Sequence, residues 1–452
     1  MGEPRLFDKL LIANRGEVAL RILRSAKELG IQTIAIYSEA DANSLVALLA
    51  DEAICIGPPP SIQSYLNQDA IIAVALAKGA QAIHPGYGFL AENAKFADRC
   101  AEVGIKFIGP SGIAIATMGN KSAAREAAIR AGVPVVPGSE GDVKSIEEAK
   151  SFADEVGYPV LIKASSGGGG KGMRRVDTPD DLESQFNSAK AESAAAFGDD
   201  RVYLEKLLEN VKHIEFQILC DSFGNGVSLF ERDCSMQRRH QKLIEEAPSS
   251  VLTPQEREEM GRSALQLAHA VDYEGAGTVE FLYAGPGQYY FMEMNTRIQV
   301  EHPVTEIICG VDIVAEQIRI ASGFPLSFTQ EDLDQPRGHA FEFRINAEDS
   351  NHGFRPNPGT IIRFVVPGGY GVRVDTALTQ GAQIPPFYDS MVAKLITFGA
   401  TRAEALIRGR RALEEFIIEG VETTIPFHLR MLDEVALIDG TMTTDYVESH
   451  MS

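Results

Sequence analysis

The segment from Thr278 to Glu306 constrains the fold more strongly than any other part of this chain. Two apolar runs within it, 278–283 and 289–294, are rich in the β-branched and aromatic residues that favour strands. Between them, residues 284–288 read Ala-Gly-Pro-Gly-Gln, a composition typical of a tight turn. The segment therefore predicts a β-hairpin.

Three polar residues are expected to share one face of this hairpin. If the turn centres between residues 286 and 287, Glu280 lies directly opposite Glu293. Side chains alternate between the two faces of a strand, so Asn295 joins Glu293 on the same face. Three hard oxygen ligands that converge in this way suit Mg²⁺ shared with substrate phosphates. The alternative is a solvated polar face on an antiparallel sheet.

The residues that follow the hairpin favour the metal site over the solvated face. Arg297, Gln299, Glu301 and His302 continue a dense polar run that contains no lysine. A surface strand has no need of that mixture, whereas a site for a metal and an anion does. We therefore expect an anion to bind beside the predicted metal.

The charge of the chain limits its partners. The 452 residues carry a formal net charge of −21 and give a pI of about 4.9, which argues against nucleic acid or an anionic membrane as partner. An anionic substrate would then need a local cationic pocket. The chain has no run of about 18 apolar residues and no secretory signal, so no membrane span is expected.

The cysteines indicate a reducing compartment. Their number is odd, they are scattered, and no two form a CxxC pair, which predicts reduced thiols in the cytoplasm and no zinc site. The five are Cys55, Cys100, Cys220, Cys234 and Cys309.

The amino-terminal part predicts an open α/β domain that extends to about residue 117. A strand at 9–13, a helix at 17–29 and a strand at 32–37 make one βαβ unit, and the alternation continues to a strand at 106–108. A dinucleotide-binding turn needs three glycines after the first strand. Only Gly16 stands there, so a nicotinamide cofactor is not expected.

Two glycine-containing loops are candidates for ligand binding. The loop His84–Phe89 follows a predicted strand, where open α/β sheets bind ligands, although a purely structural turn explains it as well. Four successive glycines, Gly167–Gly170, stand between Lys163 and Lys171. Such glycines let backbone N–H groups approach phosphate and suit a mobile lid, and the alternative is a flexible linker. The Walker A spacing is not matched.

The stretch from Phe230 to Lys242 is the densest cationic region of the chain. It predicts an anion pocket, and the alternative is a solvated run of charges. Its cations are Arg232, Arg238, Arg239, His240 and Lys242.

Eight segments of the chain carry a further pattern. They are KLLIANRGEVALRI (9–22), HPGYGFLAEN (84–93), MGNKSAAR (118–125), IKASSGGGGKGMR (162–174), ERDCSMQRRHQK (231–242), EMNTRIQVEHPVTE (293–306), RINAED (344–349) and PPFYDSMVAKL (385–395). Together they resemble biotin carboxylase, an ATP-grasp enzyme, over essentially the whole chain. Other ATP-grasp enzymes share the metal arrangement but diverge after its Asn. Asn120 and Ser166 are small departures from the pattern, since Asp and a further Gly would be expected there.

The resemblance implies a fold of mixed α/β and α+β class in three regions. These are an amino-terminal open α/β domain at 1–117, an ATP-grasp region at 118–322 with a mobile lid at 136–206, and a carboxy-terminal domain at 323–452.

The resemblance also implies the roles of individual residues. ATP contacts would come from Lys121, Lys163, Gly169, Gly170, Glu205, Lys206, Leu207, Leu208, His213, Gln237 and His240, and Mg²⁺ or Mn²⁺ ligands from Glu280, Glu293 and Asn295. Bicarbonate would be held by Lys242, Arg297, Gln299 and the Val300 backbone, with Glu301 as its base, and biotin by Arg344 with Tyr87 and Gly88 nearby.

The activity implied is ATP- and bicarbonate-dependent carboxylation of biotin through carboxyphosphate. This is the first half-reaction of acetyl-CoA carboxylase, and the same reaction opens pyruvate and propionyl-CoA carboxylases. Implied partners are a biotin carboxyl carrier protein, a carboxyltransferase and a second copy of the chain in a homodimer. Carriers present biotin on a Met-Lys-Met turn. None of the eleven methionines here precedes a lysine, so biotin is expected on another polypeptide or a missing segment.

Two other functions remain open at the level of sequence. An ATP-grasp ligase that joins an acid to an amine would need an amine for ATP turnover, whereas a carboxylase would need bicarbonate. A silent regulatory subunit would bind nucleotide without turnover, and the complete set of site residues argues against it.

Overall fold

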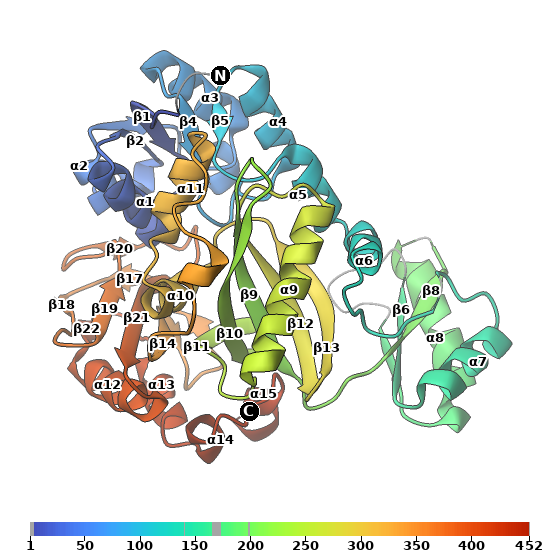
Figure 1. The fold of residues 1–452 in the computed structure, drawn as a ribbon. Helices are drawn as coiled ribbons and strands as arrows, with labels where there is room; N and C mark the ends of the chain where they lie inside the picture. Colours follow the sequence, from blue (N-terminus) through green and yellow to red (C-terminus); the bar gives the residue numbers. More distant parts are fainter. Residues whose placement is uncertain (1–3, 140, 165–172, 198, 452) are drawn as a thin grey trace. The chain divides into compact units, whose positions relative to one another are not determined.

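The computed structural model describes residues 4–139, 141–164, 173–197 and 199–451 (Figure 1). The chain forms two compact units. The first comprises Met1–Val133, Lys212–Leu282 and Glu293–Ser452, and the second comprises Pro134–Val211 and Tyr283–Met292. The predicted loop Gly167–Gly170 lies outside the described residues.

The amino-terminal part of the first unit is an open parallel sheet covered by helices, as predicted. Its strand order is β3-β2-β1-β4-β5, with β1 at the centre (Figure 1). The strands are β1 (Lys9–Ile12), β2 (Gln32–Tyr37), β3 (Glu52–Cys55), β4 (Ala82–His84) and β5 (Lys106–Phe107), and the helices are α1 (Gly16–Glu28), α2 (Leu45–Leu49), α3 (Gln68–Lys78) and α4 (Ala94–Glu102).

A second, larger sheet carries the predicted site. Its eight strands have the order β13-β12-β9-β10-β11-β14-β21-β19, and the pairs from β9 to β19 are antiparallel. The strands are β9 (Lys212–Cys220), β10 (Gly226–Arg238), β11 (Gln241–Ala247), β12 (Gly275–Gly285), β13 (Gln288–Asn295), β14 (His339–Asn346), β19 (Val372–Asp375) and β21 (Met391–Gly399).

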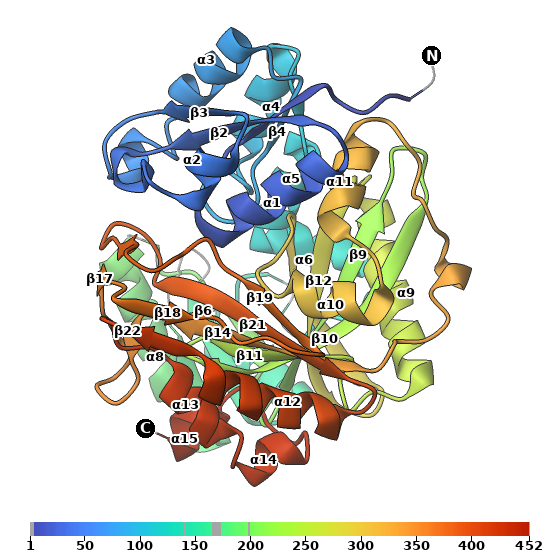
Figure 2. The same cartoon turned by 90° about the vertical axis from the view of Figure 1, so that its left-hand side faces the viewer.

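Helices cover this sheet. Figure 2 shows α12 (Arg402–Glu415) and α13 (Ile425–Met431) on the outer side of β14 and β21. Gly409 of α12 lies against the ring of Phe343, where a Cβ atom would clash, so this glycine allows the helix to approach the sheet closely. Other helices of the unit are α5 (Gly112–Gly119), α6 (Lys121–Arg130), α9 (Pro254–Ala270), α10 (His302–Cys309), α11 (Ile313–Ala321), α14 (Val435–Ile438) and α15 (Tyr446–His450).

The segment 359–365 belongs to two short sheets. The chain changes partners within it, because β17 (Gly359–Thr360) pairs with β20 (Gln383–Ile384) whereas β18 (Arg363–Val365) pairs with β22 (Ile417–Glu419). Short remaining elements are β15 (Glu348–Asp349), β16 (Arg355–Pro356) and the 3-10 turns Glu39–Asp41, Ser61–Gln63 and Gln330–Asp332.

In its described residues, the second unit is a small antiparallel sheet with two helices. Its strand order is β7-β6-β8, and its apolar core includes Ile162, Leu204 and Phe186. The strands are β6 (Val160–Ala164), β7 (Arg174–Val176) and β8 (Val202–Lys206), and the helices are α7 (Ile146–Val156) and α8 (Pro179–Phe197). Among the helices that the structure describes in either unit, none has the length and apolarity to span a bilayer.

Candidate active site

The predicted hairpin is present. Strand β12 ends at Gly285 and β13 begins at Gln288, so Pro286 and Gly287 form the loop, and Gly287 has the left-handed φ of +71° that favours glycine. The hairpin places Asn295 beside Glu280, since Asn295 Nδ2 donates to Glu280 Oε1 over 2.7 Å.

Glu280 is the most heavily hydrogen-bonded of the predicted metal ligands. Gln299 Nε2 donates to its Oε1 over 2.7 Å, Lys242 Nζ lies 3.2 Å from the same oxygen, and His213 Nε2 lies 2.8 Å from Oε2. Burial alone would raise the pKa of Glu280, but the positive charge of Lys242 and the contact with His213 lower it. The carboxylate is therefore ionised.

Glu293 is more exposed than Glu280, and the two carboxylates lie close enough to interact electrostatically. Partial desolvation and the negative charge of Glu280 raise the pKa of Glu293. Two carboxylates crowded in this way gain from a divalent cation between them, and oxygen donors are what Mg²⁺ and Mn²⁺ prefer. Glu280, Glu293 and Asn295 thus fit the ion for which the sequence predicts them.

Lys242 is surrounded by three carboxylates. Its Nζ lies 2.5 Å from Glu215 Oε2, 2.7 Å from Glu301 Oε1 and 3.2 Å from Glu280 Oε1. Glu215 is fully buried, which raises its pKa, but Lys242 and Arg232 overcome this effect and lower it to about 2. Lys242 is therefore the central cation of the site.

Sequence reasoning missed Glu215. Strand β9 places His213, Glu215 and Gln217 on one face, because they alternate with apolar residues. That period is visible in the sequence, and it would have added Glu215 to the predicted face.

Arg232 organises the buried side of the site. It is fully buried, and Nε donates to Glu215 Oε1 over 2.6 Å while Nη1 donates to Gln217 and Thr305 over 2.9 Å. Its Nη2 also donates to Gln299 Oε1. The guanidinium thus orients both Glu215 and Gln299.

The cations of the stretch 230–242 do not form one pocket, contrary to prediction. Strand β10 ends at Arg238 and β11 begins at Gln241, so Arg239 and His240 form a two-residue turn, with φ of +48° and +62°. Both are exposed, and the Arg238 guanidinium stacks on the Phe354 ring at 4.6 Å. Only Arg232 and Lys242 reach the buried cluster.

Glu301 bridges two cations. Its Oε1 contacts Lys242, and its Oε2 accepts from Arg344 Nη2 over 2.9 Å. Arg344 Nε donates to Glu245 Oε1 over 2.6 Å, which fixes the guanidinium. Burial would raise the pKa of Glu301, but Lys242 and Arg344 lower it, so the Glu301 carboxylate is ionised.

Arg297 joins the site through Asn295. Its Nη2 donates to Asn295 Oδ1 over 2.9 Å, and its Nε donates to Glu92 Oε2 over 2.9 Å. Glu92 belongs to the HPGYGFLAEN segment, so two of the segments that carry the resemblance meet here.

The side chain of Asn14 stabilises the loop that carries Tyr87 and Gly88. Asn14 Nδ2 donates to the carbonyls of Pro85 and Tyr87 over 2.6 Å and 2.8 Å. A Cβ at Gly86 would meet that amide at 2.9 Å, and both Gly86 and Gly88 have φ above +60°. The Tyr87 hydroxyl donates to Glu17.

The predicted ATP contacts are divided between the units. In the second unit Lys163 is ion-paired with Glu205, and Lys206 Nζ donates to the carbonyls of Gly157 and Tyr158 over 2.9 Å and 3.1 Å. Leu207 and Leu208 are half-buried there, while Gly169 and Gly170 lie outside the described residues. In the first unit Gln237 is buried and Lys121 is exposed at the start of α6. Asn120 caps this helix through Ala123 N, the role that Asp would have.

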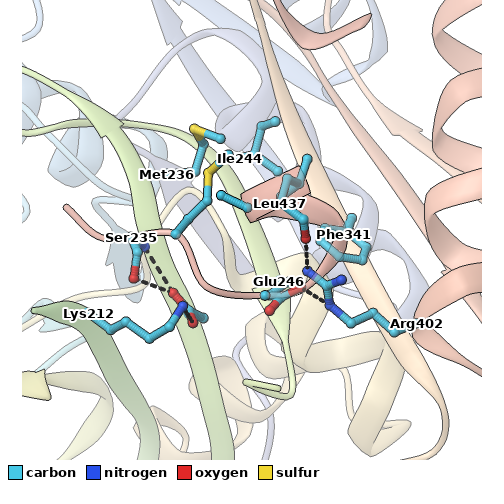
Figure 3. Close-up of a pocket in the computed structure, with 12 residues that line it drawn as sticks. Lys212, Ser235, Met236, Ile244, Glu246, Phe341, Arg402 and Leu437 are labelled. Carbon is cyan, nitrogen blue, oxygen red and sulfur yellow. Dashed lines mark hydrogen bonds and ion pairs between the residues drawn. The ribbon is translucent and has the colours of Figure 1, made fainter. Parts of the chain in front are cut away.

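The opposite face of the large sheet bears closed ion pairs around a small cavity. Lys212 Nζ lies 3.0 Å from Asp233 Oδ2, and Figure 3 shows Glu246 paired with Arg402. The cavity has room for roughly one water molecule. Its cations are neutralised, so it does not compete with the site around Glu280.

Family comparisons agree with this geometry. The model of the biotin carboxylase N-terminal domain matches residues 6–115, that of the carbamoyl-phosphate synthase L chain ATP-binding domain matches 120–329, and that of the biotin carboxylase C-terminal domain matches 342–449. Biotin carboxylase 1 of Bacillus subtilis is 55% identical over 446 residues, which are 98% of this chain and 99% of that protein. The chain belongs to the biotin carboxylase family.

Members of the biotin carboxylase family occur in more than one setting. A pyruvate carboxylase subunit of Methanothermobacter thermautotrophicus is 54% identical over 98% of this chain and 90% of its own length. A crystal structure of the biotin carboxylase domain dimer of Hydrogenobacter thermophilus 2-oxoglutarate carboxylase, in complex with MgADP, ADP and bicarbonate, has a TM-score of 0.89 at 52% identity. The match covers 99% of this chain and 98% of the Hydrogenobacter chain.

Proposed function

We propose that this chain carboxylates biotin with bicarbonate and ATP, and that Glu301 is the base that activates bicarbonate. The observation that carries the proposal is the position of Glu301, a buried carboxylate that bridges Lys242 and Arg344. One base between two cations matches a reaction in which an anion loses a proton and its charge doubles.

The first step is deprotonation of bicarbonate. Bicarbonate is a poor nucleophile until it loses its proton, and Glu301 is ionised and able to accept it. Lys242 and Arg297 offset the charge on the resulting dianion. When bicarbonate binds, Lys242 interacts with the substrate as well as with Glu301. Lys242 then stabilises the ionised form of Glu301 less, so the proton affinity of Glu301 rises in the complex.

The second step transfers the γ-phosphoryl group of ATP to an oxygen of the deprotonated bicarbonate. Glu280, Glu293 and Asn295 would hold Mg²⁺ or Mn²⁺, which offsets charge on the phosphates when bound. Lys242 and Gln299 both donate to Glu280 Oε1. These contacts keep the carboxylate in place before the ion arrives.

The third step forms carboxybiotin. Carboxyphosphate breaks down to CO₂ and phosphate, and the phosphate takes the proton from the biotin ureido nitrogen. Negative charge then develops on the ureido oxygen, and the nitrogen attacks CO₂ to form the new C–N bond. Arg344 is a permanent cation held by Glu245 and Glu301, and it is suited to that oxygen.

The partners proposed are a biotin carboxyl carrier protein and a carboxyltransferase, with a second copy of this chain. The structure of the Hydrogenobacter relative is a dimer. The exposed apolar side chains of this chain include Ile362, Val366 and Tyr370. Light scattering would measure the molar mass in solution. All five cysteines are free thiols, which fits the cytoplasmic location that we propose.

Acetyl-CoA carboxylase is the proposed setting, and pyruvate or propionyl-CoA carboxylase is the second candidate. The second candidate is supported by sequence identity. The pyruvate carboxylase subunit is 54% identical to this chain, which is nearly the same as the 55% of the Bacillus biotin carboxylase. Identification of the carboxyltransferase that co-purifies with the native protein separates the two.

ATP turnover tests the activity itself. Hydrolysis of ATP should require bicarbonate and should rise on addition of a biotinylated carrier. Turnover that requires an amine instead would identify an acid–amine ligase, and nucleotide binding without turnover under either condition would identify a silent subunit.

A further inference from the structure

Lys394 is a fully buried lysine behind the site, and none of the predicted roles includes it. It lies on β21 and its side chain has no exposed surface. Burial of an unpaired ammonium is costly, so a lysine in this position must be compensated by its contacts.

The contacts of Lys394 come from three separate parts of the first unit. Its Nζ donates to the carbonyl oxygen of Val300 over 2.9 Å, lies 3.1 Å from Glu17 Oε2 on α1, and lies 4.0 Å from Asp375 Oδ2 on β19. Burial would lower the pKa of Lys394, but Glu17, Glu342 and Asp375 raise it. The ammonium is therefore charged, and its hydrogen bond to a carbonyl is charge-assisted.

The contact with Val300 acts on the catalytic base. The carbonyl of Val300 belongs to the peptide bond that continues into Glu301, so fixing that carbonyl fixes the backbone from which the Glu301 side chain extends. The Glu301 carboxylate then reaches Lys242 and Arg344 from a held position.

The contact with Glu17 acts on the tyrosine loop. Glu17 accepts a hydrogen bond from the Tyr87 hydroxyl and also pairs with Lys394. Lys394 is therefore connected through Glu17 to Tyr87, which is a predicted biotin contact. Lys394 is also the direct cross-strand partner of Arg344 in the β14–β21 register. Residues paired in this way have side chains on the same face, so the two cations lie side by side.

We propose that Lys394 is a positioning residue for bicarbonate deprotonation. It holds the Val300–Glu301 peptide so that Glu301 stays between Lys242 and Arg344, and through Glu17 it links this geometry to the Tyr87 loop. The inference rests on the proposed function and adds a residue that does not touch substrate.

The test uses the double variant Glu17→Gln/Lys394→Met in the full chain. Removal of both charges together keeps the charge balance, and Asp375 retains its ion pair with Arg373. The amide oxygen introduced by Glu17→Gln can still accept from Tyr87. We expect bicarbonate-dependent kcat to fall by about 10²-fold, the effect of a misplacement of about 1 Å, while ATP affinity stays near that of wild type. Glu17→Gln alone should lose far less.

Leu395→Ala is the matched control, since Leu395 is a fully buried neighbour on the same strand with its side chain on the other face. If folded Leu395→Ala loses kcat as strongly as the double variant, the role of Lys394 is only structural and the proposal fails. Wild-type kcat in the folded double variant would overturn it too. Absence of bicarbonate-dependent turnover in wild type would instead overturn the proposed function.

Discussion

At the scale of single residues, the site depends on buried charges that compensate one another. Arg232 and Lys242 share Glu215, and Lys242 and Arg344 share Glu301. Each shared carboxylate is held between two cations, so removal of one group leaves its partners buried and uncompensated. The geometry that suits the chemistry and the stability of the fold therefore depend on the same residues.

Glu215→Gln should destabilise the protein strongly. The substitution leaves Arg232, which is fully buried, without its carboxylate partner. Breaking a buried pair typically costs about 3–5 kcal/mol, and we expect a loss of that order in the free energy of unfolding measured with urea. The double variant Arg232→Met/Glu215→Leu should recover much of it. A loss below about 1 kcal/mol in the single variant would show that Arg232 is compensated elsewhere.

The free energy of unfolding should decrease as the pH rises, because of the buried carboxyl of Glu342. It lies directly opposite Glu245 in the β11–β14 register, and neither of its carboxylate oxygens has a hydrogen-bond partner among the described residues. Burial raises the pKa of Glu342 well above its usual range, Glu245 and Glu301 raise it further, and Lys394 and Arg344 act in the opposite direction. Burial raises the pKa of Glu245 as well, against the positive charge of Arg344.

The direction of the pH effect follows from proton binding. Above the unfolded pKa of about 4.5 the folded protein holds a proton on Glu342 that the unfolded chain has lost, so the stability that this proton confers falls with rising pH. Glu342→Gln removes the effect. The difference in unfolding free energy between Glu342→Gln and wild type should therefore grow in favour of the variant from about pH 5 to about pH 8. A difference that does not change with pH would contradict a protonated Glu342.

At the scale of elements, alternation along strands was predictable and pairing between distant strands was not. The face shared by Glu280 and Asn295 follows from counting along one hairpin. The opposition of Glu245 and Glu342 depends on a register between strands about 100 residues apart, which no local pattern specifies. Helix α8 was not predicted, because polar residues dominate it and its apolar period is weak.

The β10–β11 turn offers a test at this scale. His240 has a φ of +62°, a conformation that costs a non-glycine residue about 1 kcal/mol, so His240→Gly should leave the unfolding free energy unchanged or slightly higher. If His240 contacts ATP, KM for ATP should rise about 10-fold, the effect of one lost hydrogen bond to a charged group. Unchanged KM in a folded variant would remove His240 from the ATP contacts.

At the scale of the whole molecule, the site is assembled from distant parts of one unit. Tyr87 comes from the loop after β4 of the amino-terminal sheet, Glu280 from β12 beside the edge strand of the large sheet, and Lys242 and Arg344 from the adjacent strands β11 and β14. The resemblance of short segments indicated these residues as a family pattern, and the structure brings them into the same unit. Their burial, and the partners Glu245 and Lys394, required the three-dimensional structure, whereas Glu215 could have been predicted from the alternation along β9.

The carrier should matter more than the biotin ring alone. A tethered ring has a higher effective concentration and adds contacts from the carrier, so carboxylation of free biotin should be much slower than that of a biotinylated carrier domain. Arg344→Gln should reduce both reactions. Equal rates with free and carried biotin, or full activity of Arg344→Gln, would contradict the proposed biotin site.

The most direct measurement of the central claim is transfer of labelled bicarbonate to a biotinylated carrier by wild type and Glu301→Gln. Glu258→Gln is the matched control, because Glu258 is exposed on α9 and pairs with Arg262 in a surface contact. We expect Glu301→Gln to bind ATP normally but to lose about 10²–10⁴ in carboxylation rate, the usual contribution of a general base. A Glu301→Gln variant that is folded and carboxylates the carrier at the rate of Glu258→Gln would contradict the account.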